Sequence, residues 1–167
     1  VGILGLGRIG REIAARAQAM RMRVVHHGRR PQPDEPFVHY ASLLDMARDV
    51  DWLVVIAPGG ALTQGIVSRQ VLEALGPDGY LVNMARGSLV DEPALIELLQ
   101  QRRLGGAALD VFADEPNVPA ALLELDNVVL SPHQGSATRQ TRDKMGALVV
   151  ANLDAHFAGE PLLSPVV

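Results

Sequence analysis

Arg86, Glu115 and His133 each follow a short apolar segment with the length of a buried strand. Because the carboxyl ends of parallel strands meet at one edge of a sheet, we expect these three residues at the same edge. Arginine can bind a carboxylate through two parallel hydrogen bonds, and a glutamate beside a histidine favours the protonated imidazole. The trio therefore suits reduction of a 2-oxo acid, which needs a cation for the carboxylate and a proton donor for the carbonyl oxygen. Taken singly, the three are also readable as a surface arginine, a loop acid and a histidine at a helix entry.

A glycine pattern at the start of the chain predicts a dinucleotide site. The segment Gly5-Leu6-Gly7-Arg8-Ile9-Gly10 follows an apolar segment and opens an amphipathic one, in the order G-x-G-x-x-G. In a strand, turn and helix of this kind, Gly5 allows the tight turn, Gly7 lets the backbone approach a pyrophosphate and Gly10 lets the helix pack closely. The alternative is a glycine-rich structural turn without a ligand.

The end of the second predicted strand bears on the choice of cofactor. An NAD site places an acid here for the adenosine ribose hydroxyls, whereas this chain has His27-Gly28-Arg29-Arg30, and Asp34 is the next acid. Without a carboxylate to repel it, a ribose 2′-phosphate can pair with Arg29 and Arg30. We therefore predict NADP at Gly28, Arg29 and Arg30. NAD is the alternative, with the arginines as solvated loop charges.

The order of apolar segments predicts the elements that position these residues. Short apolar segments alternate with segments of helical period, which indicates an α/β fold with a Rossmann-type doubly wound parallel sheet in three αβα layers. The predicted strands are Val1–Leu4, Arg23–His27, Phe37–His39, Trp52–Ile56, Tyr80–Asn83, Gly106–Asp110 and Val128–Leu130. Helices are predicted at Arg8–Met20, after an Asp91 N-cap to about Gln101, and from Ser136 to about Phe157, the last with Ala137, Met145, Leu148, Val149, Leu153 and Phe157 as its inner surface.

Composition excludes several classes of protein. The chain has 167 residues, 48% of them hydrophobic, no cysteine and a net charge of −4. Such a chain forms one domain and is neither disordered nor suited to nucleic acid, and it has no disulfide, thiol nucleophile or cysteine-bound metal. No histidine pair has the spacing of a metal site, no apolar segment is long enough to span a membrane, and a reducing cytoplasm is expected. The chain opens at Val1 inside a predicted strand, which suggests a piece of a longer protein.

Four segments in a fixed order resemble a known family. Gly5–Gly10, Val82–Glu92, Leu109–Pro116 and Ser131–Thr138 are similar to motifs of the D-isomer-specific 2-hydroxyacid dehydrogenases, over nearly the whole chain. The segments His27–Pro31 and Ala57–Gly60 resemble the NADP-dependent glyoxylate/hydroxypyruvate reductase branch. The resemblance implies that residues 1–167 are the dinucleotide-binding domain of an enzyme whose substrate-binding domain is absent from this chain. It also implies a homodimer formed through this domain.

The resemblance also implies a role for each matching residue. Arg86 would bind the substrate carboxylate, His133 would be the acid/base and Glu115 its partner. The further cofactor contacts expected are Arg8 and Ile9 at the pyrophosphate, Ala57, Pro58 and Thr63 along the cofactor, and Met84, Ala85, Arg86, Asp110, His133 and Gly135 toward the nicotinamide. Asp110 can instead be buried against backbone donors.

Two other functions stay open at this stage. One is an NAD-dependent dehydrogenase of another 2-hydroxy acid. The other is a dinucleotide-sensing protein like the corepressors that resemble this family. Under the leading hypothesis, the isolated domain binds cofactor and turns over poorly, because half of the cleft is missing.

Overall fold

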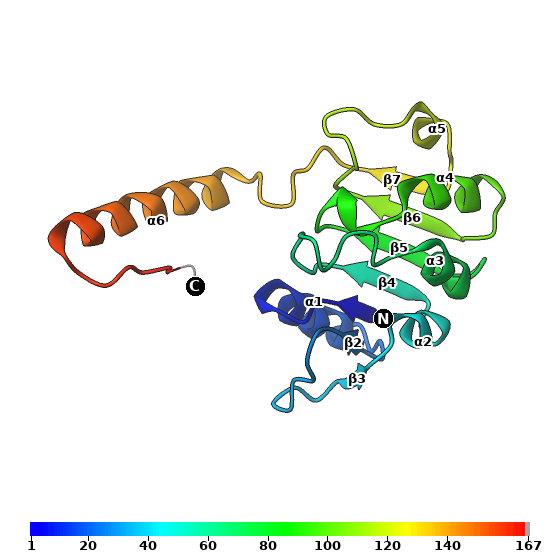
Figure 1. Ribbon diagram of the computed structural model, residues 1–167, viewed down its shortest axis with the longest axis horizontal. Helices are drawn as coiled ribbons and strands as arrows, with labels where there is room; N and C mark the ends of the chain where they lie inside the picture. Colours follow the sequence, from blue (N-terminus) through cyan, green and yellow to red (C-terminus); the bar gives the residue numbers. More distant parts are fainter. Residues whose placement is uncertain (166–167) are drawn as a thin grey trace. The chain divides into compact units, whose positions relative to one another are not determined.

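A parallel sheet organises the first of two compact units in this chain. The computed structural model describes residues 1–165, and its units are Val1–His133 and the segment from Gln134 onward (Figure 1). In the first unit, seven parallel strands are ordered β3-β2-β1-β4-β5-β6-β7 among the described residues. The strands are β1 (Gly2–Leu4), β2 (Val25–His27), β3 (Val38–Tyr40), β4 (Trp52–Val55), β5 (Tyr80–Asn83), β6 (Gly106–Leu109) and β7 (Val128–Leu130). This order confirms the predicted Rossmann-type sheet.

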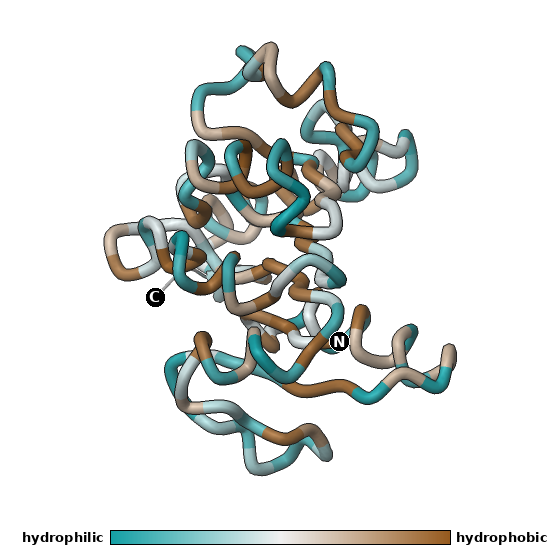
Figure 2. The backbone as a smooth tube through the Cα atoms, turned by 90° about the vertical axis from the view of Figure 1, so that its right-hand side faces the viewer, coloured by the Kyte–Doolittle hydropathy of each residue, from teal (hydrophilic) through white to brown (hydrophobic). Residues whose placement is uncertain are grey.

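Helices cover the two faces of this sheet unequally. The helices of the first unit are α1 (Arg8–Ala19), α2 (Leu43–Arg48), α3 (Arg69–Leu75), α4 (Glu92–Gln100) and α5 (Ala120–Leu123), with a short 3₁₀ helix at Gly87–Leu89. Neighbouring residues of a strand point to opposite faces. In β1, Ile3 packs with Ala14 and Ala17 of α1, whereas Leu4 belongs to the core shared by α2, α3 and α4. Figure 2 shows hydrophobic and hydrophilic stretches alternating along the backbone.

The predicted strands are all present: Tyr80–Asn83 and Val128–Leu130 have the predicted bounds, and the others differ by one or two residues at an end. The second strand was predicted from Arg23, but β2 begins at Val25, the residue that pairs with Gly2 at the start of β1. Phe37 was predicted to open the third strand, but it packs in the core beside α1, and β3 begins at Val38. Strand ends are therefore set by the available pairing partner rather than by side-chain type.

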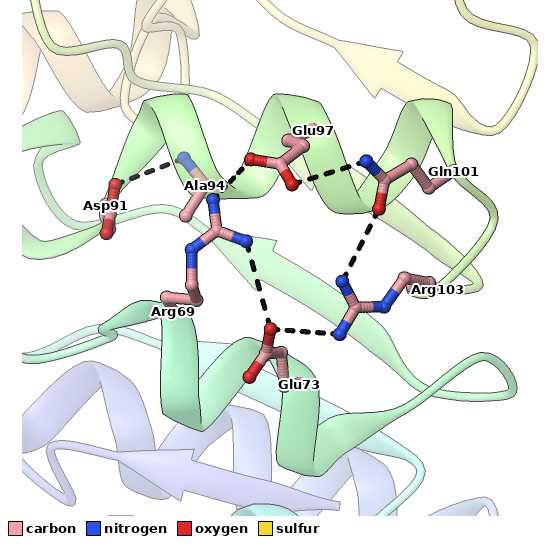
Figure 3. A network of polar contacts seen from close by, with 7 residues as sticks. All are labelled: Arg69, Glu73, Asp91, Ala94, Glu97, Gln101 and Arg103. Atoms are coloured by element: carbon pink, nitrogen blue, oxygen red, sulfur yellow. Dashed lines mark hydrogen bonds and ion pairs between the residues drawn. The ribbon is translucent and has the colours of Figure 1, made fainter.

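A network of polar contacts joins α3 to α4 on the surface (Figure 3). Arg69 of α3 pairs with Glu97 of α4, and Arg103 beyond α4 donates to Glu73 of α3 at 3.0 Å. The hydrogen bond from Arg69 lowers the pKa of the Glu97 carboxyl below its usual range. These contacts hold the two helices together. Because the charges of the two arginines and the two glutamates cancel, the contacts leave no excess charge for a ligand.

As far as residue 165, the second unit contains one helix, α6 (Arg139–Ala158), followed by a segment that folds back on it. The side-chain amide of Asn152 donates to Oγ of Ser164 at 2.9 Å, and the Ser164 backbone N–H donates to Asn152 at 3.1 Å. The helix begins three residues later than predicted, because the hydroxyl of Thr138 caps it by accepting from the Thr141 N–H. No helix in residues 1–165, α6 included, is both long enough and apolar enough to cross a membrane.

The predicted inner surface of the last helix is wrong. Met145, Leu148, Val149, Leu153 and Phe157 are exposed, Phe157 by 84%, and Ala137 precedes the helix and is also exposed. Ala155 is buried instead. A helical period shows which residues share a face, but this unit has no second helix or sheet of its own, among the described residues, to cover that face.

Candidate active site

The glycine-rich turn lies where the direction of the sheet order reverses, between β1 and β4. Gly5 has φ of +101°, and a Cβ there would lie 2.7 Å from the backbone of Ala57 after β4. A Cβ on Gly10 would lie 2.3 Å from the carbonyl oxygen of Gly5, so the helix approaches the turn too closely for a larger residue. The topology places this turn at the crevice where open α/β sheets bind ligands.

The start of α1 has the features that a pyrophosphate needs. Gly7 is the N-cap, no side chain caps the helix, and no acid occurs in its first turn. A Cβ on Gly7 would meet nothing within 4 Å, which leaves the backbone open to a ligand on that side. Free N–H groups and the positive end of a helix favour an anion. The residues present therefore fit a dinucleotide, with Arg8 and Ile9 exposed beside them.

A methyl group at Gly10 tests this geometry. We expect Gly10→Ala to lower the free energy of unfolding by about 1–3 kcal/mol and to weaken NADPH binding, because the new Cβ pushes α1 away from Gly5. Urea denaturation and NADPH titration measure the two effects. Gly146→Ala is the matched control, since a Cβ there meets nothing within 4 Å and alanine favours a helix. Unchanged stability and affinity in Gly10→Ala would contradict the close approach.

The end of β2 places two arginines in solvent. Gly28, Arg29 and Arg30 directly follow the strand, and both arginine side chains are exposed. Neither arginine has a carboxylate partner in residues 1–165, whereas Arg11, Arg16 and Arg23 each pair with an acid. Two unpaired cations thus lie at the end of the strand where the sequence predicts the ribose 2′-phosphate.

The loop after β4 is stabilised by a hydrogen bond from the hydroxyl group of Thr63 to a backbone carbonyl of the same loop. Thr63 donates to the carbonyl oxygen of Pro58 at 2.7 Å and also lies 3.2 Å from that of Gly60. Ala57 is buried and Pro58 is exposed. Thr63 therefore shapes this loop, and its predicted contact with the cofactor stays a prediction.

Asn83 holds the loop that carries Arg86. It ends β5 with 1% of its surface exposed, its side-chain amide donates to the Arg86 carbonyl at 3.0 Å, and its oxygen accepts from the Ala85 N–H at 3.1 Å. Arg86 then follows in an extended conformation, with its side chain exposed beside Gly59. Sequence reasoning missed Asn83, although a polar residue at the end of an apolar strand was a signal for it.

Glu115 and His133 are in direct contact. Nδ1 of His133 lies 2.7 Å from Oε2 of Glu115, and Oε1 of Glu115 accepts from the Phe112 backbone N–H at 3.1 Å. His133 has a positive φ of 50°, an uncommon conformation for a residue other than glycine. Because the carboxylate accepts from Nδ1, the ring nitrogen that remains for a substrate is Nε2.

Hydrogen bonding keeps Glu115 charged. The hydrogen bond from His133 lowers the pKa of the Glu115 carboxyl below its usual value, with smaller contributions from the Phe112 N–H and from the positive charges of His133 and Arg86, against desolvation. A carboxyl with a lowered pKa stabilises the fold above its ordinary pKa and loses that effect as the pH falls through the lowered one. Glu115 is therefore a carboxylate throughout the neutral range.

Backbone contacts join the Arg86 loop to the Glu115 loop. A Cβ on Gly87 would lie 2.0 Å from the carbonyl carbon of Phe112, so these two segments touch. Oε2 of Glu92, in the first turn of α4, accepts from the Ala113 N–H at 3.0 Å. The structure thereby brings the Arg86, Glu115 and His133 segments to one edge of the sheet. Glu92 is a second residue that the sequence did not identify.

The other predicted contacts lie at the same strand ends or in the second unit. Met84 is 39% exposed and Ala85 is buried in the turn after β5. The Asp110 N–H donates to the Asn83 carbonyl at 3.0 Å, which places Asp110 beside that turn. Leu6 of the glycine-rich turn is buried in the core beside α1, and Gly135 belongs to the second unit. No cluster of three metal-ligating side chains occurs in the part of the chain that the structure describes.

Comparison with known proteins gives a consistent set of relatives. Residues 1–135 match the family model for "D-isomer specific 2-hydroxyacid dehydrogenase, NAD binding domain". A glyoxylate/hydroxypyruvate reductase of Arabidopsis thaliana is 52% identical over all 167 residues, which cover 53% of its length. A hydroxyphenylpyruvate reductase of Plectranthus scutellarioides is 50% identical, again over 53% of its length. The chain thus spans about half the length of the curated relatives that it matches.

A solved structure has the same fold at high similarity. The NADPH-dependent glyoxylate/hydroxypyruvate reductase of Sinorhizobium meliloti, in complex with NADP and malonate, is 49% identical, with a TM-score of 0.97. The match covers 99% of this chain and 52% of that one.

Proposed function

The chain belongs to the D-isomer-specific 2-hydroxyacid dehydrogenase family, and we propose that it is the dinucleotide-binding domain, residues 1–167, of a longer reductase. That enzyme transfers hydride from NADPH to the keto carbon of a small 2-oxo acid and yields a D-2-hydroxy acid. Residues 166 and 167 of the proposed domain lie outside the described residues. The observation that carries the proposal is the Glu115–His133 pair, 2.7 Å apart, at the same sheet edge as Arg86.

The residues of this site divide the reaction between them. NADPH supplies the hydride when it is bound. Arg86 binds the substrate carboxylate through its guanidinium group, which orients the keto group. The imidazolium of His133 gives the proton on Nε2 to the carbonyl oxygen as the C=O double bond becomes C–O–H. Glu115 stabilises the charged ring before transfer and holds it by Nδ1. One hydride and one proton thus convert the ketone into an alcohol.

The residues at the end of β2 favour NADP as the cofactor. Arg29 and Arg30 are exposed and have no acidic partner in the described chain, and no acid stands at the end of β2. The similar Sinorhizobium enzyme is described as NADPH-dependent, which supports the same choice. NAD remains the alternative cofactor, because the glycine-rich turn serves either dinucleotide.

Glyoxylate and hydroxypyruvate are the substrates to test first, because relatives of this chain are named glyoxylate/hydroxypyruvate reductases. Other relatives are a hydroxyphenylpyruvate reductase and a 2-ketogluconate reductase, so related enzymes are named for larger substrates. We place the choice among 2-oxo acids in the part of the enzyme outside this chain. The isolated domain should bind cofactor and turn over poorly, because half of the cleft is missing.

Turnover of the full-length protein tests the function. We expect glyoxylate- and hydroxypyruvate-dependent oxidation of NADPH, with kcat/KM for NADPH at least about tenfold above that for NADH, which corresponds to about 1.4 kcal/mol. Loss of NADPH absorbance measures it. Turnover that favours NADH would support a dehydrogenase that uses NAD. Cofactor binding without oxidation by any 2-oxo acid would leave a dinucleotide-sensing protein as the function.

The oligomeric state and location are further parts of this proposal. A homodimer through this domain is supported by exposed apolar side chains on the sheet face that α3 and α4 do not cover, such as Val129 and Trp52. Light scattering on the full-length protein and cell fractionation would establish a dimer and a cytoplasmic location, respectively.

A further inference from the structure

Arg11 ties the loop between β2 and β3 to helix α1. Nη2 of Arg11 donates to the side-chain oxygen of Gln32 at 2.6 Å, and Nε of Arg11 donates to Oε1 of Glu35. The Glu35 side chain is 17% exposed and that of Arg11 46%. In Figure 1, this loop lies beside α1, near the end that follows the glycine-rich turn. The loop that begins with Arg29 and Arg30 is therefore held against the first turns of α1.

Glu35 brings a negative charge into the same loop as the two unpaired arginines. Burial lowers the pKa of His26 in β2, and the negative charge of Glu35 opposes that effect. His39 of β3 fixes the loop on the other side through a contact of 3.2 Å between Nε2 and the Gly28 carbonyl. The loop between β2 and β3 is thus held by β3 at one end and by α1 at the other, and the Glu35 carboxylate lies within it.

The position of this carboxylate matters for the nucleotide. In a Rossmann-type fold, the adenosine ribose binds between the start of the first helix and the end of the second strand. Arg11 lies one turn into that helix and Glu35 in the loop after that strand. An unpaired carboxylate there would repel a 2′-phosphate, whereas ribose hydroxyls tolerate or bind such a group. With Arg11 bound to Glu35, the pair has no net charge.

We propose that Arg11 is a positioning residue that determines cofactor specificity: by pairing with Glu35, it neutralises a carboxylate that would otherwise oppose the 2′-phosphate of NADP. This inference rests on the proposed use of NADP. The arginines would then have two different roles: Arg29 and Arg30 attract the 2′-phosphate, and Arg11 neutralises the carboxylate that would repel it.

A double-mutant cycle in the full-length protein tests the inference. Kd for NADPH and for NADH is measured by fluorescence titration at low ionic strength for the wild type, Arg11→Gln, Glu35→Gln and the double variant. We expect Arg11→Gln to weaken NADPH by about three- to tenfold, because one carboxylate becomes unpaired near a phosphate dianion, and to weaken NADH by less than about twofold. The double variant should recover the wild-type ratio of the two Kd values, since it lacks both charges.

Two further variants control for folding and for general charge effects. Arg16→Gln removes an exposed pair with Glu12 on the same helix and should leave both Kd values unchanged. Arg11→Lys retains the charge and should keep the ratio within about twofold of the wild type. Circular dichroism of each variant checks that α1 remains folded.

The outcomes separate this inference from the proposed function. A wild type that binds NADH as well as NADPH would refute the choice of NADP and, with it, this role for Arg11. A wild type that prefers NADPH, with the same ratio in Arg11→Gln, would overturn the inference alone. A double variant that stays as weak as Arg11→Gln would also overturn it, because Arg11 would then act as a tether and not by charge.

Discussion

His133→Gln should lower kcat for 2-oxo acid reduction by about two to four orders of magnitude, the usual contribution of general acid–base catalysis. Glutamine can keep a hydrogen bond to Glu115, but its amide is too weak an acid to transfer a proton to the substrate at neutral pH. The loss should fall mainly on kcat, because the glycine-rich turn and Arg86 still bind cofactor and substrate. Steady-state kinetics with saturating NADPH measures kcat and KM, and NADPH titration shows that the site is intact.

Two further variants serve as comparisons for the loss of kcat in His133→Gln. Glu115→Gln keeps an acceptor for the Phe112 N–H but removes the charge beside His133, so its kcat should fall by less than that of His133→Gln. His156→Gln changes an exposed histidine on α6 and should leave kcat unchanged. An unaltered kcat in His133→Gln would remove His133 from the acid/base role, whatever Glu115→Gln shows.

The sheet was predictable because its strands are bounded by strong local signals. Several strands are followed by glycine or close with a polar residue, as β1 is followed by Gly5 and β5 ends at Asn83. The short helices α2, α3 and α5, of 6, 7 and 4 residues, could not be assigned, because fewer than two turns hold too little of the 3.6-residue period. The face of α6 was predicted wrongly because periodicity identifies an apolar side without showing what covers it.

The residues proposed for the reaction were easier to find in the sequence than the residues that position them. Arg86, Glu115 and His133 stand out by type and by their place after strands, and the topology brings such positions together. Asn83 and Glu92 act on backbone groups of Arg86 and Ala113, whose positions depend on loop conformation. The Arg11–Glu35 contact joins residues 24 apart in the sequence. No local pattern predicts contacts of this kind.

Arg86→Ala should lower kcat/KM by about two to three orders of magnitude, because an ion pair with the substrate carboxylate contributes about 2–5 kcal/mol when one partner is removed. KM should rise and kcat should fall, because the role proposed for Arg86 is both to bind the carboxylate and to orient the keto group. Arg86→Lys retains the charge without the two-pronged geometry and should lie between the wild type and alanine.

Steady-state kinetics on glyoxylate gives both constants, and Arg48→Ala, which breaks an exposed pair with Asp45, is the matched control. Arg86 is exposed and held by its backbone through Asn83, so its removal should leave the fold unchanged. A variant with normal KM for glyoxylate would assign the carboxylate to another cation.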